Sequence, residues 1–392
     1  MGNETLPTIE GRCLPRYAPL KDALLANFRE AGELGAALAV YLDGEPVVDL
    51  WAGSIDNRHS APWREDTLVN VFSTTKGMVS AMALRLVAEG KLSLARPVAD
   101  YWPEFAQNGK GGIPVQWLLT HRAGLPAVRA LLPDAALYDW EAMCAALAAE
   151  TPWWPPGTRH GYHPITFGWL VGEVIRRVSG MRVGEFWQQA FAQPLGLDFF
   201  IGVPVAEQAR IARVSKPLAE PGNLEVLGFM QKMMADPQGI TARAFANPLS
   251  ITTGTNTPEW RSAEIPAANG HGTARAVARF YAALAGGGTL DGVEVLPRDI
   301  LKYCSEEQSA GSDAVLGIDT RFSCGWMLSQ NRPNTAFGPG RRSFGHPGAG
   351  GSVGLADPDR RIGFGYVMNR MGAHILLDPR ATRLIDTLYR CL

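Results

Sequence analysis

Strand patterns lie at the two ends of this chain, and helical patterns fill its middle. Two apolar runs in residues 35–53 flank Asp43-Gly44, which predicts a β-hairpin near the N-terminus. Near the C-terminus, apolar residues alternate over 362–368, which predicts a half-buried strand. Strands from both ends must lie side by side to share a core. We therefore expect an α/β (α+β) fold, in which an antiparallel sheet built from both termini is flanked by helices and interrupted by a mostly helical domain.

The helices between these strands show an apolar period of three to four residues. The segment 74–88 is almost wholly apolar, and Gly90 is placed to end it. Near the end of the chain, Asp378 is expected to cap the last helix, with Pro379 in its first turn. Helices are expected over residues 18–31, 74–88, 273–288 and 379–392, with several more between 91 and 210.

These patterns divide the chain into two domains. Residues 1–72 and 269–392 are expected to form the discontinuous sheet domain, and residues 73–268 the helical one, with the active site at their interface. The segment 217–268 has an irregular, Pro- and Gly-punctuated pattern, which predicts either a flexible flap over a binding cleft or a surface insertion packed on its own apolar residues. Its large apolar residues are Phe229, Met230, Met233, Met234, Phe245 and Trp260.

Charge and hydropathy exclude several classes of partner. The net charge of the 392-residue chain is −1, and it has no basic block, so we expect no nucleic-acid partner. No apolar run reaches 18 residues, so no membrane partner is expected. The start of the chain has no apolar core of a signal peptide, which predicts a cytoplasmic location. The patterns do not indicate an oligomeric state.

The cysteines and histidines do not form a recognisable metal pattern. The five cysteines are scattered without a C-x-x-C spacing, so we expect free thiols and no disulfide. His160 and His163 are close in sequence but have no carboxylate at a metal-ligand spacing. We therefore expect neither a metal nor any other cofactor.

One short motif suggests a nucleophile at Ser352. Residues 350–354 read Gly-Gly-Ser-Val-Gly, which matches the G-x-S-x-G elbow of many lipases and esterases. An elbow serine stands between a strand and a helix, whereas the residues after Ser352 predict a strand, a turn and another strand. We expect Ser352 to be a structural residue in a glycine-rich turn.

A better candidate is the S-x-x-K motif formed by Ser73 and Lys76 at the start of the apolar helix. A serine there lies at the positive end of the helix dipole, which favours an oxyanion. Lys76 is one turn further on and on the same face, so the two side chains can meet. Burial should lower the pKa of Lys76 and make it a base. The alternative is that Ser73 only caps the helix and Lys76 extends to solvent.

A third catalytic group is expected at Tyr162, between a glycine-rich turn and a new helix. Beside a buried ammonium its pKa would fall, and it could act as a phenolate base and then as an acid toward the leaving group. The alternative is that Tyr162 only packs at the start of that helix.

Seven segments, in order along nearly the whole chain, carry a resemblance to a known family. The chain resembles the serine β-lactamase/penicillin-binding-protein superfamily, in particular its esterase branch, the family VIII carboxylesterases. The segments are VFSTTKG (71–77), LSLARPVADYWPEF (92–105), WLLTHRAGLP (117–126), PPGTRHGYH with GWLVGEVIRRVSG (155–180), PLGLDFFIG (194–202), NGHGTARAVARFYAALAGGG (269–288) and FGHPGAGGSVGLADP (344–358).

The resemblance implies roles for several residues. Ser73 corresponds to the acylated serine, Lys76 to its basic partner and Tyr162 to the tyrosine of the Y-x-N motif. The backbone N–H groups of Ser73 and Ala349 would form the oxyanion hole. The stretch His346-Pro347-Gly348 falls where β-lactamases have Lys-Thr-Gly, on the strand that edges the active site. The implied substrate-binding residues are His346, Gly348 and Phe344.

Two departures from the β-lactamase pattern concern the substrate. Pro164 stands where β-lactamases have the Asn of Y-x-N, and His346 stands where they have a lysine. A neutral histidine gives a substrate carboxylate no counter-charge. No counterpart of the general-base Glu of class A β-lactamases is found either. Trp153 and Trp154 are either further walls of the cleft or core residues.

Together these features predict a carboxylesterase that hydrolyses short-chain or small apolar esters through an acyl-serine. A small-molecule ester is the expected partner. The alternatives are a β-lactamase or D-alanyl peptidase, an acyltransferase in which another alcohol takes the acyl group, and a non-catalytic binding protein.

Overall fold

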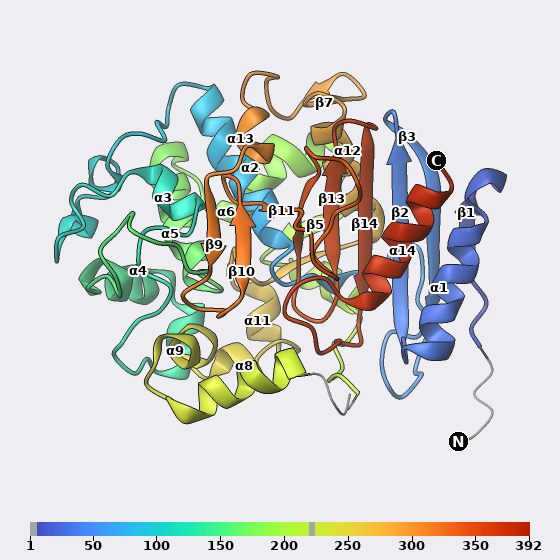
Figure 1. Ribbon diagram of the computed structural model, residues 1–392, viewed down its shortest axis with the longest axis horizontal. Coiled ribbons are helices and arrows are strands. Elements are labelled where there is room, and N and C mark those ends of the chain that lie inside the picture. The colour runs from blue at the N-terminus through green and yellow to red at the C-terminus, as the bar shows by residue number, and fades with distance from the viewer. Residues whose placement is uncertain (1–5, 219–223) are drawn as a thin grey trace.

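Strands from both ends of the chain meet in one antiparallel sheet in the computed structural model, which describes residues 6–218 and 224–392. The nine strands follow the order β1-β3-β2-β14-β13-β12-β11-β10-β9, so N-terminal β2 pairs with C-terminal β14 (Figure 1). The sheet expected from both termini is confirmed. Its strands are β1 (Glu10–Cys13), β2 (Gly35–Leu42), β3 (Glu45–Gly53), β9 (Ser309–Ser312), β10 (Asp319–Phe322), β11 (Met327–Leu328), β12 (Phe344–Pro347), β13 (Val353–Asp357) and β14 (Ile362–Met368).

Helices cover both faces of this sheet. Helices α1 (Pro19–Glu30) and α14 (Pro379–Arg390) pack on one face, and α12 (Ala274–Ala285) packs on the other (Figure 1). Asp378 caps α14 as expected, because its side chain accepts a hydrogen bond from the backbone N–H of Arg380. The β2–β3 hairpin turns through Asp43-Gly44, as predicted.

Strand β14 differs from its prediction in one respect. It was expected to be half-buried, but all seven of its residues are buried. Between its large side chains lie Gly363 and Gly365, whose Cα atoms lie against the backbone of α12. The prediction was wrong because helices cover both faces of the strand, and glycine, which has no side chain, allows the second helix to approach closely.

The two ends of the inserted helical part lie side by side in the fold. Strand β4 (Val69–Asn70), just before it, pairs with β6 (Gly270–Gly272), just after it, and β5 (Phe199–Ile201) completes this small sheet. Beyond α12, β7 (Thr289–Leu290) and β8 (Val293–Glu294) form a hairpin. The other α-helices are α2 (Thr75–Ala88), α3 (Val115–Leu119), α4 (Trp140–Ala149), α5 (Thr166–Ser179), α6 (Val183–Trp187), α7 (Gln193–Leu195), α8 (Leu224–Ala235), α9 (Ile240–Ala246), α10 (Ser250–Thr253), α11 (Pro258–Ser262) and α13 (Lys302–Ser305).

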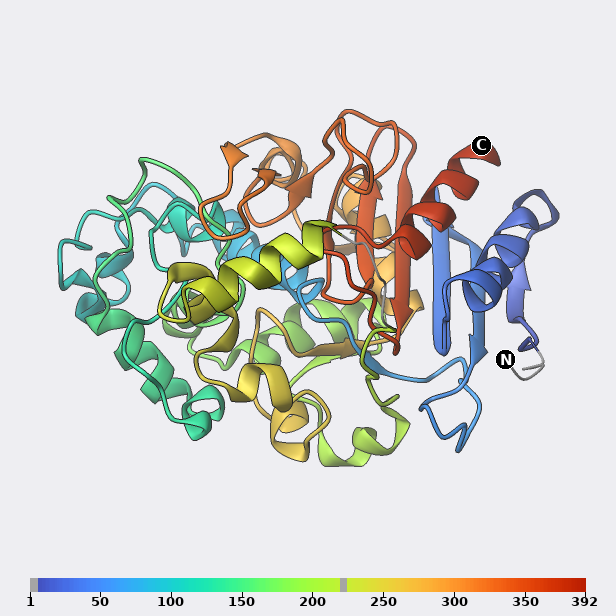
Figure 2. The same ribbon diagram turned by 60° about the horizontal axis from the view of Figure 1, so that its bottom comes forward.

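The segment expected to be irregular contains four of these helices, α8 to α11, although residues 219–223 lie outside the described part. Figure 2 shows α8 lying across the front of the molecule. Helices α9, α10 and α11 have only 7, 4 and 5 residues, too few to show a helical period in the sequence. Helix α8 has 12 residues and was missed by the sequence analysis. Trp260 on α11 is a core residue, and its indole N–H donates to Asn70 at 3.0 Å. That residue therefore belongs to the core and not to a flap.

None of the helices in the described ranges is long and apolar enough to span a membrane.

Candidate active site

Ser73 lies in the tight turn that leads into α2. Phe72, directly before it, has a φ of 47°, a left-handed conformation that non-glycine residues adopt only where the surroundings enforce it. Two contacts hold this turn: Val71 N–H donates to the carbonyl of Gly270 at 2.8 Å, and the Thr75 hydroxyl donates to the carbonyl of Phe72 at 2.5 Å. Ser73 is thereby fixed, half-buried, at the positive end of a 14-residue helix.

Lys76 is fully buried in α2, and its amine faces Ser73. Its Nζ atom lies 3.0 Å from Ser73 Oγ and donates to the carbonyl oxygens of Pro164 at 2.7 Å and Ala267 at 2.9 Å. Burial lowers the pKa of Lys76 well below its usual value. Because carbonyl oxygens only accept, two N–H bonds of the amine point at them. In the neutral amine, the lone pair then faces the Ser73 hydroxyl.

Tyr162 reaches the same pair from the loop before α5. The Ser73 side chain lies close enough to the Tyr162 hydroxyl to lower its pKa, and Lys76 Nζ lies 4.8 Å from the centre of the tyrosine ring. The ring stacks on Phe322 at 6.0 Å and meets the edge of His121 at 5.0 Å. The structure thus brings Ser73, Lys76 and Tyr162 together.

The protonation state of Tyr162 differs from our expectation. We predicted a lowered pKa beside an ammonium, but burial raises the pKa of Tyr162 above its usual value and outweighs the lowering effect of Ser73. That prediction was wrong because the same burial favours the neutral amine of Lys76, which cannot stabilise a phenolate. Tyr162 is therefore a protonated phenol at neutral pH.

Ser352 supports the turn before Ser73. Its hydroxyl donates to the carbonyl of Val71 at 2.7 Å and lies 3.2 Å from the hydroxyl of Thr74. It is buried, and strand β13 follows it where an elbow would need a helix. These contacts fit the structural role expected for it.

The glycine-rich turn between β12 and β13 packs directly on the segment before the helix. Gly351 N–H donates to the carbonyl of Gly348 at 3.1 Å. Because the peptide unit is planar and trans, the N–H of Ala349 points away from the inside of this turn. A Cβ atom on Gly348 would lie 2.1 Å from the carbonyl oxygen of Val71, so only glycine allows this contact. Ala349 itself is exposed.

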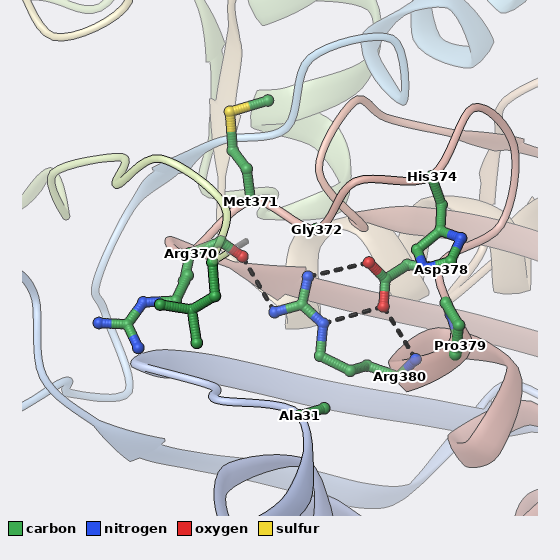
Figure 3. A pocket seen from close by; sticks show the side chains of 9 residues that line it. Ala31, Arg370, Met371, Gly372, His374, Asp378, Pro379 and Arg380 are labelled. Atoms are coloured by element: carbon green, nitrogen blue, oxygen red, sulfur yellow. Dashed lines mark hydrogen bonds and ion pairs between the residues drawn. The ribbon is translucent and has the colours of Figure 1, made fainter. Parts of the chain in front are cut away.

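Arg380 stabilises the same turn between β12 and β13. This residue was not identified by the sequence analysis. Its guanidinium donates to the carbonyl oxygens of Gly350 at 2.8 Å and Arg370 at 2.9 Å, and to Glu33 Oε1 at 3.0 Å. It also makes two bonds to Asp378, at 2.9 and 3.0 Å (Figure 3). All five N–H groups of this buried side chain therefore have acceptors. The partners come from four separate places in the chain, so no local pattern indicates them.

Comparison with known proteins identifies the family of this chain. A family model described as Beta-lactamase matches residues 22–387. The chain belongs to this family. The esterase/beta-lactamase LipL of Mycobacterium tuberculosis is 35% identical over 374 residues, which are 95% of this chain and 85% of LipL.

Two solved structures extend this similarity to nearly the whole fold. A penicillin-binding protein homolog from Caulobacter crescentus is 42% identical, with a TM-score of 0.89 over 98% of this chain and 100% of that chain. A family VIII carboxylesterase is 40% identical, with a TM-score of 0.88 over 98% of this chain and 100% of that chain. The β-lactamase-like fold expected from the sequence is confirmed. An esterase-type serine hydrolase is the class of enzyme that these similarities support.

In this beta-lactamase family member, His346 on β12 is a buried, neutral imidazole. Its Nδ1 lies 2.8 Å from the carbonyl of Pro347, which can only accept, so Nδ1 carries the proton. Burial lowers the pKa of His346 to about 3, with a smaller contribution from Lys76. The ring centre lies 6.1 Å from that of Tyr162, and Nε2 has no hydrogen-bond partner within the described ranges. His346 is therefore uncharged, and its acceptor atom Nε2 is enclosed by the protein.

The structure places the expected wall residues mainly in the core. Phe344 on β12 is buried, with its ring 5.6 Å from that of Trp326 and 6.5 Å from that of Tyr281, so it is a core residue of the sheet. Trp154 is also buried. Trp153 is partly exposed and lies 4.1 Å from the guanidinium of Arg129.

No group of three or more His, Cys, Asp or Glu side chains is arranged to hold a metal within residues 6–218 and 224–392. The ring of His163 is engaged elsewhere: its Nδ1 bonds to the carbonyl of Gly161 at 2.7 Å, and its Nε2 accepts from Leu125 N–H at 3.0 Å. That the enzyme needs no metal or cofactor stays a prediction.

Proposed function

We propose that this protein is a carboxylesterase that hydrolyses uncharged, short-chain or small apolar carboxylic esters through an acyl-Ser73 intermediate. The observation that carries the proposal is the environment of Lys76. Its amine is desolvated, is bound to two carbonyls and faces the serine hydroxyl, and no carboxylate of residues 6–218 or 224–392 forms a hydrogen bond or ion pair with it. Such an amine is a base ready to take the serine proton.

Acylation of Ser73 is the first half of the proposed reaction. Ser73 Oγ attacks the ester carbonyl carbon while its proton passes to Lys76. The oxyanion that forms is held by the backbone N–H groups of Ser73 and Ala349. The ester C–O bond breaks, and the phenol of Tyr162 protonates the leaving alkoxide and regains a proton from the Lys76 ammonium.

Deacylation uses the same groups in the second half of the cycle. A water molecule attacks the acyl carbon and gives one proton to Lys76. The carboxylic acid leaves, and Ser73 Oγ takes a proton back. The enzyme returns to its starting state with one ester and one water converted to an acid and an alcohol.

His346 supports a preference for uncharged substrates. A β-lactam or D-alanyl peptide carries a carboxylate, and an imidazole with a pKa of about 3 gives it no counter-charge at neutral pH. Hydrolysis of such substrates is the second candidate, favoured by the similarity to LipL, which is named an esterase/beta-lactamase. Transfer of the acyl group to an added alcohol is a third outcome of the same intermediate. For the site of action we propose the cytoplasm.

The test compares Ser73→Ala with Ser352→Ala on p-nitrophenyl butyrate. We expect Ser73→Ala to lower kcat/KM by at least about 10³-fold, because it removes the nucleophile. We expect Ser352→Ala to lose less than about tenfold, because it removes only a supporting hydrogen bond. A fluorophosphonate should label wild type on Ser73, as located by peptide mass spectrometry.

Three results would contradict the proposal. If a folded Ser352→Ala variant loses activity while Ser73→Ala stays active, Ser352 and not Ser73 is the nucleophile. Turnover of nitrocefin as fast as that of the ester would favour the second candidate. A protein without any fluorophosphonate adduct would be a non-catalytic binding protein.

A further inference from the structure

The loop that carries Tyr162 has no helix or strand, yet three consecutive N–H groups of its backbone are bound. Gly161 N–H donates to the carbonyl of His121 at 3.1 Å, and His163 N–H donates to Nδ1 of the same histidine at 3.2 Å. Between them, Tyr162 N–H donates to both carboxylate oxygens of Asp313, at 3.0 and 2.9 Å. The position of Tyr162 is thus set by two side chains distant in sequence.

Asp313 is a buried carboxylate whose oxygens are occupied by donors. It is 1% exposed and lies in the connection from β9 to β10. Besides Tyr162, Oδ1 accepts from the N–H groups of Val315 and Leu316, both at 2.9 Å, and Oδ2 accepts from the Thr320 hydroxyl at 3.1 Å. The backbone N–H partners can only donate, so both oxygens of Asp313 act as acceptors, Oδ1 toward its own turn and both oxygens toward Tyr162.

We propose that Asp313 is a positioning residue for catalysis and acts through Tyr162. The inference rests on the proposed function, in which the Tyr162 phenol donates the proton to the leaving alkoxide. By holding the backbone N–H of Tyr162, Asp313 sets where the hydroxyl lies relative to Ser73 and Lys76. A misplacement of about 1 Å of such a group costs roughly 10²-fold in rate.

A second buried aspartate distinguishes this role from ordinary support of a turn. Asp357 is also buried, and its Oδ1 accepts from the N–H groups of Asp359 and Arg360 in its own turn, at 2.9 and 3.3 Å. Asp357 Oδ2 also accepts from the hydroxyl of Tyr389 at 2.7 Å, so each of the two aspartates supports its own turn and binds one tyrosine distant in sequence. Only the tyrosine bound by Asp313, which is Tyr162, lies in the active site. Asp357→Asn is therefore a matched control for the stability cost of Asp313→Asn.

The experiment is a double-mutant cycle on p-nitrophenyl butyrate hydrolysis, with Asp313→Asn made in wild type and in Tyr162→Phe. In wild type we expect kcat to fall about 10- to 100-fold with KM within about threefold, because substrate still reaches Ser73 but proton transfer is misaligned. In Tyr162→Phe, the same substitution should cost less than about threefold, since no hydroxyl is left to position. Asp357→Asn should lower the Tm to a similar degree and leave kcat within about twofold of wild type.

Opposite results would overturn the inference. It fails if Asp313→Asn keeps wild-type kcat, or if it costs the same factor in both backgrounds, which would indicate a general structural effect. If Tyr162→Phe itself keeps full activity, the role of Tyr162 in the proposed function fails, and the positioning role fails with it. If Tyr162→Phe loses activity as expected while Asp313→Asn keeps its kcat, only the positioning role of Asp313 is rejected.

A second variant covers the case in which Asp313→Asn does not fold. Thr320→Val keeps the carboxylate and removes one of its donors. We expect a loss in kcat of about three- to tenfold in wild type and no further loss in Tyr162→Phe. An equal loss in both backgrounds, or none in wild type, contradicts the proposal.

Discussion

Lys76 and Lys110 show that burial alone does not make a lysine a base. Both are fully buried, and burial lowers the pKa of each. Lys110 Nζ donates to three carbonyl oxygens, those of Gln107, Ala148 and Glu150, which suits a charged ammonium with three protons. Lys76 has only two carbonyl partners, and its third neighbour is the hydroxyl of Ser73, which can give up a proton.

This difference predicts that two similar substitutions have different consequences for activity. Lys76→Met should lower kcat/KM for p-nitrophenyl butyrate by about 10²- to 10⁴-fold, because the base is lost. Lys110→Met should stay within about threefold of wild type, although each variant leaves buried carbonyls without a donor and lowers the Tm. The measurement is steady-state kinetics beside thermal unfolding of both variants. Equal activity losses at equal Tm would show that Lys76 only supports the fold.

At the scale of elements, the contact between β14 and α12 depends on missing side chains. A Cβ atom on Gly363 would lie 2.3 Å from the backbone nitrogen of Ala282 and 2.4 Å from the carbonyl oxygen of Ala278. Backbone atoms inside a helix cannot move aside as a flexible side chain can. The helix covers the sheet at this distance only because the strand carries glycine there.

Gly363→Ala is therefore expected to lower the free energy of unfolding by about 1–3 kcal/mol or more, through overpacking. Gly112→Ala is the control, because a Cβ there meets no atom within 4 Å, and it should change stability by less than about 0.5 kcal/mol. Urea unfolding of both variants measures the difference. A neutral Gly363→Ala would mean that α12 can shift away from the sheet.

At the scale of the whole molecule, buried neutral histidines make the stability of the fold sensitive to acid. Among the residues that the structure describes, burial lowers the pKa of five histidines and raises that of three carboxyl groups, so the histidines outnumber the groups with the opposite effect. For His163, His271 and His346 the folded pKa falls to about 3. Between pH 3 and about 6.5, the unfolded chain binds protons at these residues that the folded chain does not.

The free energy of unfolding should accordingly decrease as the pH is lowered from about 6.5 to 4.5. His271→Gln removes one of these groups and should make this decrease shallower by about 1.4 kcal/mol per pH unit. His271 lies on β6, outside the proposed catalytic set, so it serves as a probe of stability alone. Urea unfolding at several pH values measures both slopes. A stability that stays constant over this range, or a variant with the wild-type slope, would contradict the prediction.

Local features of the fold and the site were readable from the sequence because they depend on near neighbours along the chain. The β2–β3 hairpin needs only two apolar runs and a turn that favours Asp-Gly. The meeting of Ser73 with Lys76 needs only one helical turn between them. The position of Tyr162 beside them was expected mainly from the resemblance to a known family, since no helical or strand period relates it to that pair.

The groups that tune the site were decided by the tertiary structure alone. The amine of Lys76 is oriented by the carbonyls of Pro164 and Ala267. Every residue offers a backbone carbonyl, so the sequence does not indicate which two will be used. The bond between Asp313 and Tyr162 and the bonds from Arg380 to Glu33 and Gly350 likewise join groups that are distant in sequence. Burial also reversed the expected pKa shift of Tyr162, because solvent exclusion depends on which elements pack together. The sequence by itself determined the elements and the local Ser–Lys pair, whereas long-range packing decided which protons those residues hold.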